Sequence, residues 1–285
     1  MKNCIQRVYG GRRKDITRFY KWILACLIFS SLIVFCNDSL AVNIKSLVAL
    51  WLFDEGSGQV VTDETGNGHK GTIQNPKWVA GKFGTSLEFQ GQAGDPNYVI
   101  IRHHADFDFG QDDFTIGLWI DSKKADAYII AKRRLEPANW WNLNSAIDRP
   151  GNFFGFEYAG GGAGLAADFG AIDGKVEIVN SGWHHVAAVK AGDNLQLYVD
   201  GVLDVQKDGM KKNAKWSVDN KDPIQIGGWG KFENLVGSVD EMFIAKDAFT
   251  VGDLKKIMNG WKRAQPVFSS EKLSSIWGKI KKENN

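Results

Sequence analysis

The segment 183–201, WHHVAAVKAGDNLQLYVDG, decides the fold class of this chain. Its first part, 183–190, is rich in aromatic and β-branched residues, and its second part has apolar residues at 195, 197 and 199. The break between them, Ala-Gly-Asp-Asn, has the composition of a tight turn, so the segment predicts a β-hairpin. Asp200 and Gly201 supply a second turn into 202–205, which predicts three consecutive antiparallel strands.

The rest of the chain has the composition of many short strands. Its 285 residues include 11 Trp and 32 Gly but only 6 Pro, a mixture that suits strands joined by tight turns. One helix is predicted at 251–259, between a capping-box-like Thr250 and Gly260. Further strands are predicted at 47–53, 71–73, 86–89, 98–102, 114–120, 128–133, 153–158, 224–227 and 236–245, with a less regular segment around 140–151. This pattern indicates an all-β sandwich or barrel.

The first 41 residues are predicted to form an export signal. Seven Lys or Arg residues accompany about 15 largely apolar residues at 22–36, and Ser39, Leu40 and Ala41 fit a cleavage site. The apolar run is short for a bilayer span, but an uncleaved N-terminal membrane anchor stays an alternative. We therefore expect the remainder of the chain to be secreted or held in the cell envelope.

Cysteine and charge exclude several kinds of function. All three cysteines lie within residues 1–41, so the remaining chain has neither a disulfide nor a thiol nucleophile. The whole chain carries a net charge of +2, whereas residues 42–285 contain 28 basic and 31 acidic residues. No basic patch in that part suits a nucleic acid, so no nucleic-acid partner is expected.

Seven short motifs follow one another in an order that resembles a known family. They cover about 46–247 and resemble laminin-G-like, concanavalin A-like jelly-roll domains. The motifs lie at 50–58, 63–68, 81–89, 113–119, 182–187, 197–201 and 237–241. The resemblance implies a jelly roll of two antiparallel sheets, with the first and last strands adjacent. Residues 248–285 then form a helix and an amphipathic tail, in which 269–282 has helical spacing.

The sequence favours a binding module over an enzyme. The glucanase branch of this fold places paired carboxylates on one strand as Glu-x-Asp-x-x-Glu, and no such run is present. Asp240 and Glu241 are adjacent, so on a strand they point to opposite faces. His103-His104 and His184-His185 are interpreted as structural histidines. The alternatives are a glycoside hydrolase or lyase with an unrecognised site, and a purely structural interaction module.

Oxygen-bearing side chains suggest a structural calcium site. The glycine-rich loop 63–68 carries Asp63 and Asn67, and the resemblance places Asp240 near it. Relatives often hold calcium in this region, and carboxylates, amides and carbonyls are the ligands that Ca²⁺ prefers. The alternative is that Asp63 and Asn67 cap a turn through their own backbone.

Aromatic and polar residues in two irregular segments are the candidate ligand-binding residues. An aromatic ring can cover the apolar face of a sugar while amides and carboxylates bind its hydroxyl groups. The candidates are Trp140, Trp141, Asn142, Trp229, Lys231, Phe232 and Glu233. The expected partner is a carbohydrate or a cell-surface or matrix protein.

Overall fold

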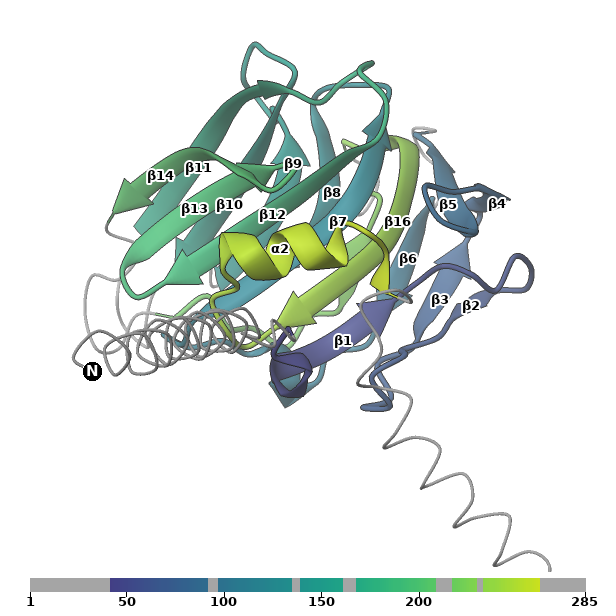
Figure 1. The fold of residues 1–285 in the computed structure, drawn as a ribbon, viewed down its shortest axis with the longest axis horizontal. Coiled ribbons are helices and arrows are strands. Elements are labelled where there is room, and N and C mark those ends of the chain that lie inside the picture. The colour runs from purple at the N-terminus through teal and green to yellow at the C-terminus, as the bar shows by residue number, and fades with distance from the viewer. Residues whose placement is uncertain are drawn as a thin grey trace, which may run out of the picture. The chain divides into compact units, whose positions relative to one another are not determined.

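The computed structural model describes residues 42–91, 97–134, 139–160, 168–208, 217–229 and 233–261. These residues form two packed antiparallel sheets followed by one short helix (Figure 1). The predicted jelly-roll sandwich is therefore confirmed. The predicted export signal and the amphipathic tail lie outside the described residues. Within the described ranges, no helix combines the length and the hydrophobicity that a membrane span needs.

The first sheet, called sheet A, has the order β14-β13-β12-β7-β16-β5-β4. Strand β1 is its eighth strand and pairs with β16 outside this linear order. The second, sheet B, has the order β11-β10-β9-β8-β15-β6-β3-β2. The strands of sheet A are β1 (Leu47–Trp51), β4 (Lys77–Ala80), β5 (Thr85–Gln90), β7 (Phe114–Ser122), β12 (His184–Ala191), β13 (Asn194–Val199), β14 (Val202–Asp208) and β16 (Val236–Ala245). Those of sheet B are β2 (Val60–Val61), β3 (Gly71–Gln74), β6 (Tyr98–Ile101), β8 (Ala127–Arg134), β9 (Asn139–Ser145), β10 (Phe153–Gly160), β11 (Asp168–Glu177) and β15 (Ile224–Ile226).

The hairpin that decides the fold class forms as predicted. Strand β12 pairs with β13 from Ala191 opposite Asn194 to Val186 opposite Val199, and β14 follows as the third strand. These strands occupy one end of sheet A, where β14 is the edge and β12 pairs with β7. The hairpin and β14 therefore form one edge region of sheet A.

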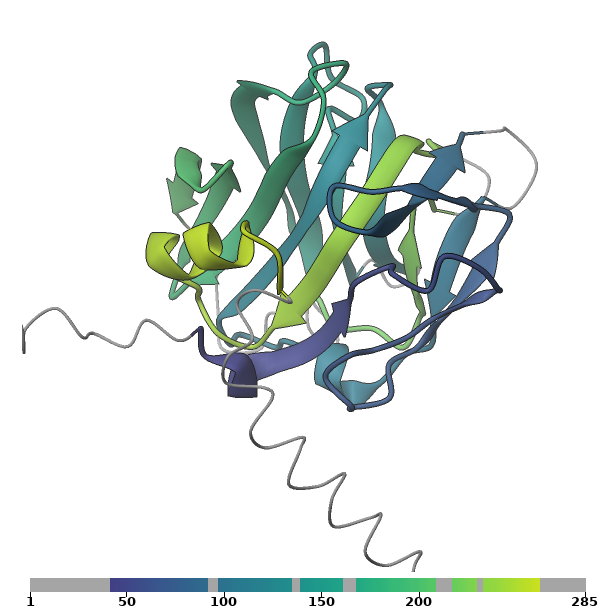
Figure 2. The same ribbon diagram turned by 45° about the vertical axis from the view of Figure 1, so that its right-hand side comes forward.

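The first and last strands of the sandwich are adjacent, as the family resemblance implied. Strand β1 runs antiparallel to β16, with Leu50 opposite Phe243, and Figure 2 shows the two side by side. Strand β16 also pairs with β5 and β7. The two ends of the domain are thus joined at the centre of sheet A.

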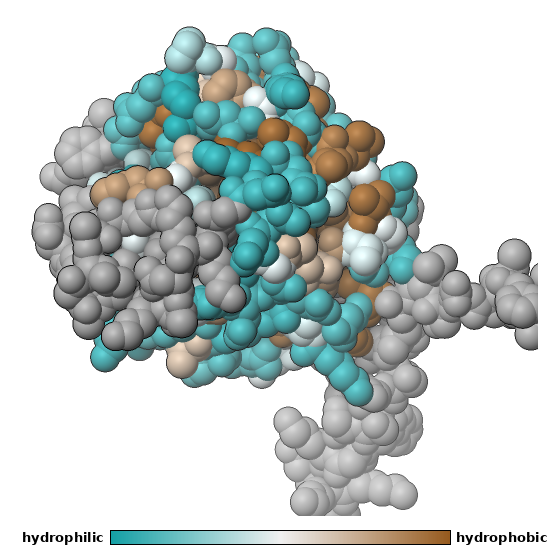
Figure 3. Space-filling model, turned by 90° about the vertical axis from the view of Figure 1, so that its left-hand side faces the viewer, coloured by the Kyte–Doolittle hydropathy of each residue, from teal (hydrophilic) through white to brown (hydrophobic). Residues whose placement is uncertain are grey.

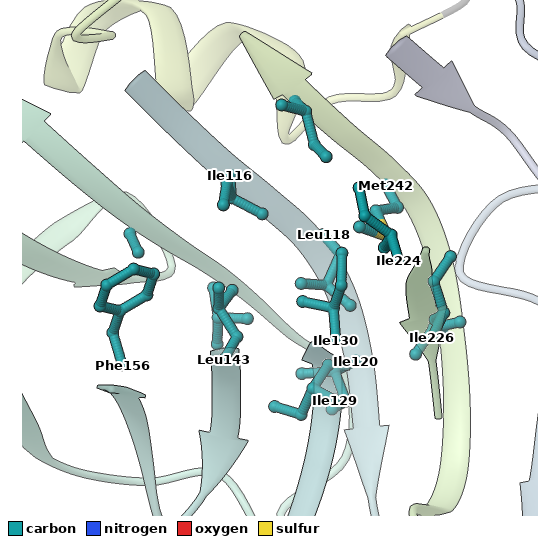
Figure 4. Packing of buried hydrophobic residues seen from close by; sticks show 14 of the residues in the cluster. Ile116, Leu118, Ile120, Ile129, Ile130, Leu143, Phe156, Ile224, Ile226 and Met242 are labelled. Atoms are coloured by element: carbon teal, nitrogen blue, oxygen red, sulfur yellow. The ribbon is translucent and has the colours of Figure 1, made fainter. Parts of the chain in front are cut away.

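A single apolar core fills the space between the sheets. The alternation predicted for 114–120 is confirmed, because Phe114, Ile116, Leu118 and Ile120 are all buried in this core. Side chains of β8, β9, β10, β15 and β16 meet them from the other strands (Figure 4). Burying such a layer on both inner faces is what holds two sheets together without disulfides.

Helix α2 (Val251–Ile257) covers the outer face of sheet A (Figure 1). Thr250 and Asp253 form the predicted capping box, which satisfies the first free N–H groups of the helix. Leu254, Ile257 and Trp261 then pack against Phe243 and Val189 of the sheet. Helix α2 therefore covers part of the outer face of sheet A.

Four strands were not predicted: β2, β4, β9 and β11. Strand β9 contains two consecutive tryptophans, which break the simple alternation of apolar and polar residues. Trp141 faces the core and Trp140 faces outward from sheet B. Both side chains are nevertheless buried. The irregular segment expected around 140–151 is therefore a regular strand up to Ser145, and only its second part is a turn.

Candidate ligand-binding site

The outer face of sheet B presents side chains from neighbouring strands in register. Arg133 of β8 lies opposite Trp140 of β9, and Trp140 lies opposite Ala159 of β10. Ala159 is in turn opposite Phe169 of β11. Because directly opposed residues of antiparallel strands point to the same face, these four residues form one row across the sheet.

Arg133 is enclosed by three aromatic rings. Its guanidinium carbon lies 4.2 Å from the centroid of Trp140, 4.8 Å from that of Trp229 and 5.0 Å from that of Tyr128. It also donates a hydrogen bond to the Tyr128 hydroxyl. Cation–π contacts at these distances hold a planar cation against ring faces. We call Arg133, Trp140, Trp229, Tyr128 and Phe169 the aromatic–arginine cluster.

The edge of the aromatic–arginine cluster is open to solvent at Phe169. This side chain is 63% exposed, and its ring centroid lies 6.1 Å from that of Trp140. On the side of β11 and β14, Figure 3 shows apolar residues as separate patches among hydrophilic ones. An aromatic ring exposed on an edge strand beside a second aromatic ring can stack on the flat face of a ligand.

The protonation states around the aromatic–arginine cluster follow from burial. Burial raises the pKa of Tyr128 to about 12, although the charge of Arg133 acts in the opposite direction. Tyr128 therefore keeps its proton and can donate a hydrogen bond. Burial also raises the pKa of Glu233, and the carboxylates of Asp126 and Asp148 add to this increase.

A chain of polar side chains lies on the same face, over β9, β10 and β11. Asn144 donates to Asn142 at 2.9 Å, and Asn142 donates to Glu157 at 3.3 Å. Arg149 forms ion pairs with Glu157 at 2.7 Å and with Asp173 at 3.0 Å. Asn142 and Asn144 are fully buried, whereas Arg149 and Asp173 are partly exposed. Arg149 and Asp173 are therefore the members of this chain of polar groups that are most accessible to solvent.

The structure brings some of the predicted ligand-binding residues together and separates others. Trp140 and Trp229 meet on Arg133, and the carbonyl of Glu233 accepts a hydrogen bond from the Tyr128 amide at 2.8 Å. Asn142 lies beneath the surface and holds Glu157. Trp141 faces the core and is 1% exposed, which removes it from this surface. Lys231 and Phe232 lie outside the described residues.

Arg133, Tyr128, Glu157 and Phe169 belong to this surface but were not identified from the sequence. Tyr128, Arg133 and Glu157 lie in predicted strands without a local motif, and Phe169 lies in β11, which was not predicted. Their convergence depends on the strand order β11-β10-β9-β8, which alternation within one strand does not reveal.

The predicted calcium ligands have other partners in the structure. Asp63 accepts hydrogen bonds from the backbone N–H groups of Leu50, Thr65 and His69 and from the Thr65 hydroxyl, at 2.7 to 3.2 Å. Asn67 directs its amide nitrogen, a donor, to the carbonyls of Leu47 and Val48. The Asp63 carboxylate and the Asn67 amide nitrogen thus hold the loop against β1, as in the turn-capping alternative, and the calcium role of these residues stays a prediction.

Asp240, the third predicted ligand, lies at a different loop. Its carboxylate accepts hydrogen bonds from the N–H groups of Phe83 at 2.9 Å and of Glu241 at 2.8 Å. Burial raises its pKa to about 7, and the charge of Asp54 adds to the increase. Glu241 instead accepts the N–H of Trp261. The two adjacent carboxylates therefore serve separate segments, in line with the prediction that they do not act as a pair.

Comparisons with known proteins agree with this architecture. A family model described as the concanavalin A-like lectin/glucanases superfamily matches residues 93–255. A search of curated proteins finds no match. The binding domain of Paraclostridial Mosquitocidal Protein 1 is similar with a TM-score of 0.62 and 15% identity, over 76% of this chain and 53% of that one.

Two further solved structures are similar. Domain 4 of AbnA, a GH43 extracellular arabinanase from Geobacillus stearothermophilus solved with arabinotriose, gives a TM-score of 0.55 at 19% identity, over 74% of this chain and 98% of that one. The binding domain of Botulinum neurotoxin DC in complex with SialylT gives a TM-score of 0.59 at 15% identity, over 76% of this chain and 52% of that one. The chain spans about half the length of the two toxin domains. At these identities the likeness establishes a shared fold.

Proposed function

Because this chain belongs to the concanavalin A-like lectin/glucanases superfamily, we propose that it is an exported, non-catalytic module that binds glycans. The binding surface in this proposal is the outer face of sheet B at the aromatic–arginine cluster. Export is supported by the basic and apolar pattern of residues 1–41.

The observation that carries this proposal is the arrangement of rings around Arg133. Trp140, Trp229 and Tyr128 hold the guanidinium, and Phe169 extends the row to the open edge of the sheet. Glu157, Arg149 and Asp173 lie on the same face. Stacking surfaces beside charged donors and acceptors are the two components that sugar recognition requires, one for the ring face and one for the hydroxyls.

The similar structures support binding as the general role. Two of them are binding domains of toxins, and the arabinanase domain was solved with arabinotriose. The partner of each is a property of that protein, and its identity to this chain is below 20%. They favour a binding module over an enzyme, whereas the ligand has to be argued from the side chains of this chain.

We expect Phe169→Ala to weaken glycan binding by about tenfold without lowering stability, because it removes an exposed ring that packs on little else. Trp229→Ala should have a similar effect on affinity, since Trp229 is one wall of the cluster. The measurement is calorimetric titration with arabinotriose, a sialylated oligosaccharide and neutral glucan oligosaccharides.

The matched control is Val202→Ala. Val202 is also 63% exposed, but it lies on β14, the edge strand of sheet A. This variant should bind every glycan as the original chain does. If none of the three glycan classes binds, the structural interaction module is favoured, and release of reducing ends from a polysaccharide would contradict the non-catalytic proposal.

A further inference from the structure

Two histidines and one aspartate meet at the end of β3 and β6 in sheet B. These strands are antiparallel, with Gly71 opposite Ile101. His69 lies two residues before Gly71, and His104 lies three residues after Ile101, so the pairing brings both to the same end of the sheet. Asp106 follows in the 3-10 helix η2 (Ala105–Phe107). Sequence reasoning passed over His69 and interpreted His104 as structural.

The ligand atoms of these three side chains converge on one point. The Nε2 atom of His69 lies 2.9 Å from Oδ2 of Asp106, and the Nδ1 atom of His104 lies 3.1 Å from the same oxygen. All three atoms are within 4.8 Å of one another. In the part of the chain that the structure describes, this is the one such group of three or more metal-ligating side chains.

Two groups of Asp106 face the same nitrogen of His104. Its Nδ1 accepts the backbone N–H of Asp106 at 3.2 Å, which requires a lone pair on that nitrogen. The same lone pair then lies 3.1 Å from an Asp106 carboxylate oxygen, which is also an acceptor. When Nδ1 carries no proton, its lone pair and the carboxylate oxygen are two ligand atoms that one cation can bind together.

His69 is held rigidly in its position. Asp63 accepts its backbone N–H at 3.0 Å, and its carbonyl accepts the indole N–H of Trp51 at 2.7 Å. The side chain of His69 is 5% exposed, and its ring lies 4.6 Å from that of Phe107. Such fixed orientation of a ligand reduces the entropy lost on metal binding. Asp63 therefore contributes to this site by positioning His69.

We propose that His69, His104 and Asp106 bind a zinc-class divalent cation, with water completing the shell. Imidazole nitrogen and carboxylate oxygen are ligands that Zn²⁺ takes in tetrahedral sites, where neighbouring ligand atoms are about 3.3 Å apart. The observed separations from the shared oxygen are close to this value. Two imidazoles are unsuitable for Ca²⁺, which takes oxygen ligands. The exposed ring of His104 can turn to close the shell.

The cation joins two segments that are distant in sequence. It links the end of the 63–69 loop to the turn that follows β6, and both segments lie next to the core through Trp51 and Phe107. Because it binds the folded arrangement and not the separate segments, it stabilises the domain by an amount that rises with the logarithm of its concentration above Kd. This inference does not depend on the proposed glycan binding.

The test is titration of Zn²⁺ into the full-length chain, prepared without a polyhistidine tag and freed of metal by a chelator. We expect one equivalent to bind and to raise the melting temperature, with no comparable increase from Ca²⁺. His104→Ala and Asp106→Asn should each weaken this binding by more than about 100-fold, the upper range for loss of a supporting residue. His104 is mostly exposed and caps only the short 3-10 helix η2, so we expect the variant to fold, which its melting temperature without metal checks.

His103→Ala is the matched control, because His103 is the adjacent histidine and contributes no atom to the group. It should bind Zn²⁺ as the original chain does. Co²⁺ serves as a spectroscopic probe that separates nitrogen and oxygen ligands from the thiolates of Cys4, Cys26 and Cys36, which alone give intense sulfur-to-metal charge-transfer bands. Zinc binding that survives His104→Ala, or a Co²⁺ spectrum dominated by thiolate bands, would overturn the proposal.

Discussion

Replacing Asp63 by alanine is expected to lower the free energy of unfolding by about 4 kcal/mol, and to do so in the presence of a chelator. The carboxylate accepts the N–H groups of Leu50 and His69, both buried, together with the N–H and hydroxyl of Thr65. Each buried donor left without an acceptor costs about 1–3 kcal/mol. The measurement is equilibrium unfolding in urea, with EDTA in one series and excess calcium in the other.

The comparison of the two series separates a hydrogen-bonding role of Asp63 from a calcium-binding role. If Asp63 holds the loop through hydrogen bonds, the loss is equal in both series. A loss that appears with calcium and disappears with EDTA would restore the calcium interpretation of Asp63. Asp193→Ala is the control, since Asp193 is an exposed carboxylate in the β12–β13 turn and its removal should change stability by less than about 0.5 kcal/mol.

Stability that depends on His185 should be lost as the pH falls below neutrality. Burial lowers the pKa of His185 to about 4, and the nearby carboxylate of Asp200 offsets part of this effect. In the unfolded chain the pKa is near the ordinary 6.5. Below that pH the unfolded state takes up a proton that the folded state refuses, so unfolding is favoured. The full effect, reached near pH 4, is about 3 kcal/mol.

The measurement compares the free energy of unfolding of the original chain and of His185→Leu between about pH 7.5 and pH 4. The difference between the two proteins should change by about 3 kcal/mol in favour of the variant as the pH falls. Groups common to both proteins, including Asp240, cancel in this difference. Val189→Ala changes the same face of β12 without a titrating group, so its difference from the original chain should not vary with pH.

The hairpin, the alternation of β7 and the capping box of α2 could be predicted because each depends on neighbours in sequence. A turn of Gly, Asp and Asn fixes a reversal of the chain locally, and a period of two assigns the faces of a strand. Strand β9 was missed because consecutive tryptophans hide that period, although both are accommodated on opposite faces. The inner and outer faces of such a strand are distinguished only once its neighbours are in place.

The candidate sites required more than the sequence contains. Trp140 and Trp229 were identified as residue types suited to a ligand, but the cation they surround, Arg133, comes from a third segment. Asp63 was identified as an oxygen ligand, whereas the structure uses it to position His69. In both cases the residue type suggested a binding role, whereas the neighbours of the side chain are given only by the tertiary structure.

The sequence by itself determined the fold class, the order of most strands along the chain and the absence of cysteine from residues 42–285. Those properties follow from local periodicity, turn composition and residue counts. The tertiary structure decided which strands are neighbours and in what register, and therefore which side chains share a surface. Register is set by burial summed over both sheets, since a shift of one residue turns every side chain of a strand to the other face.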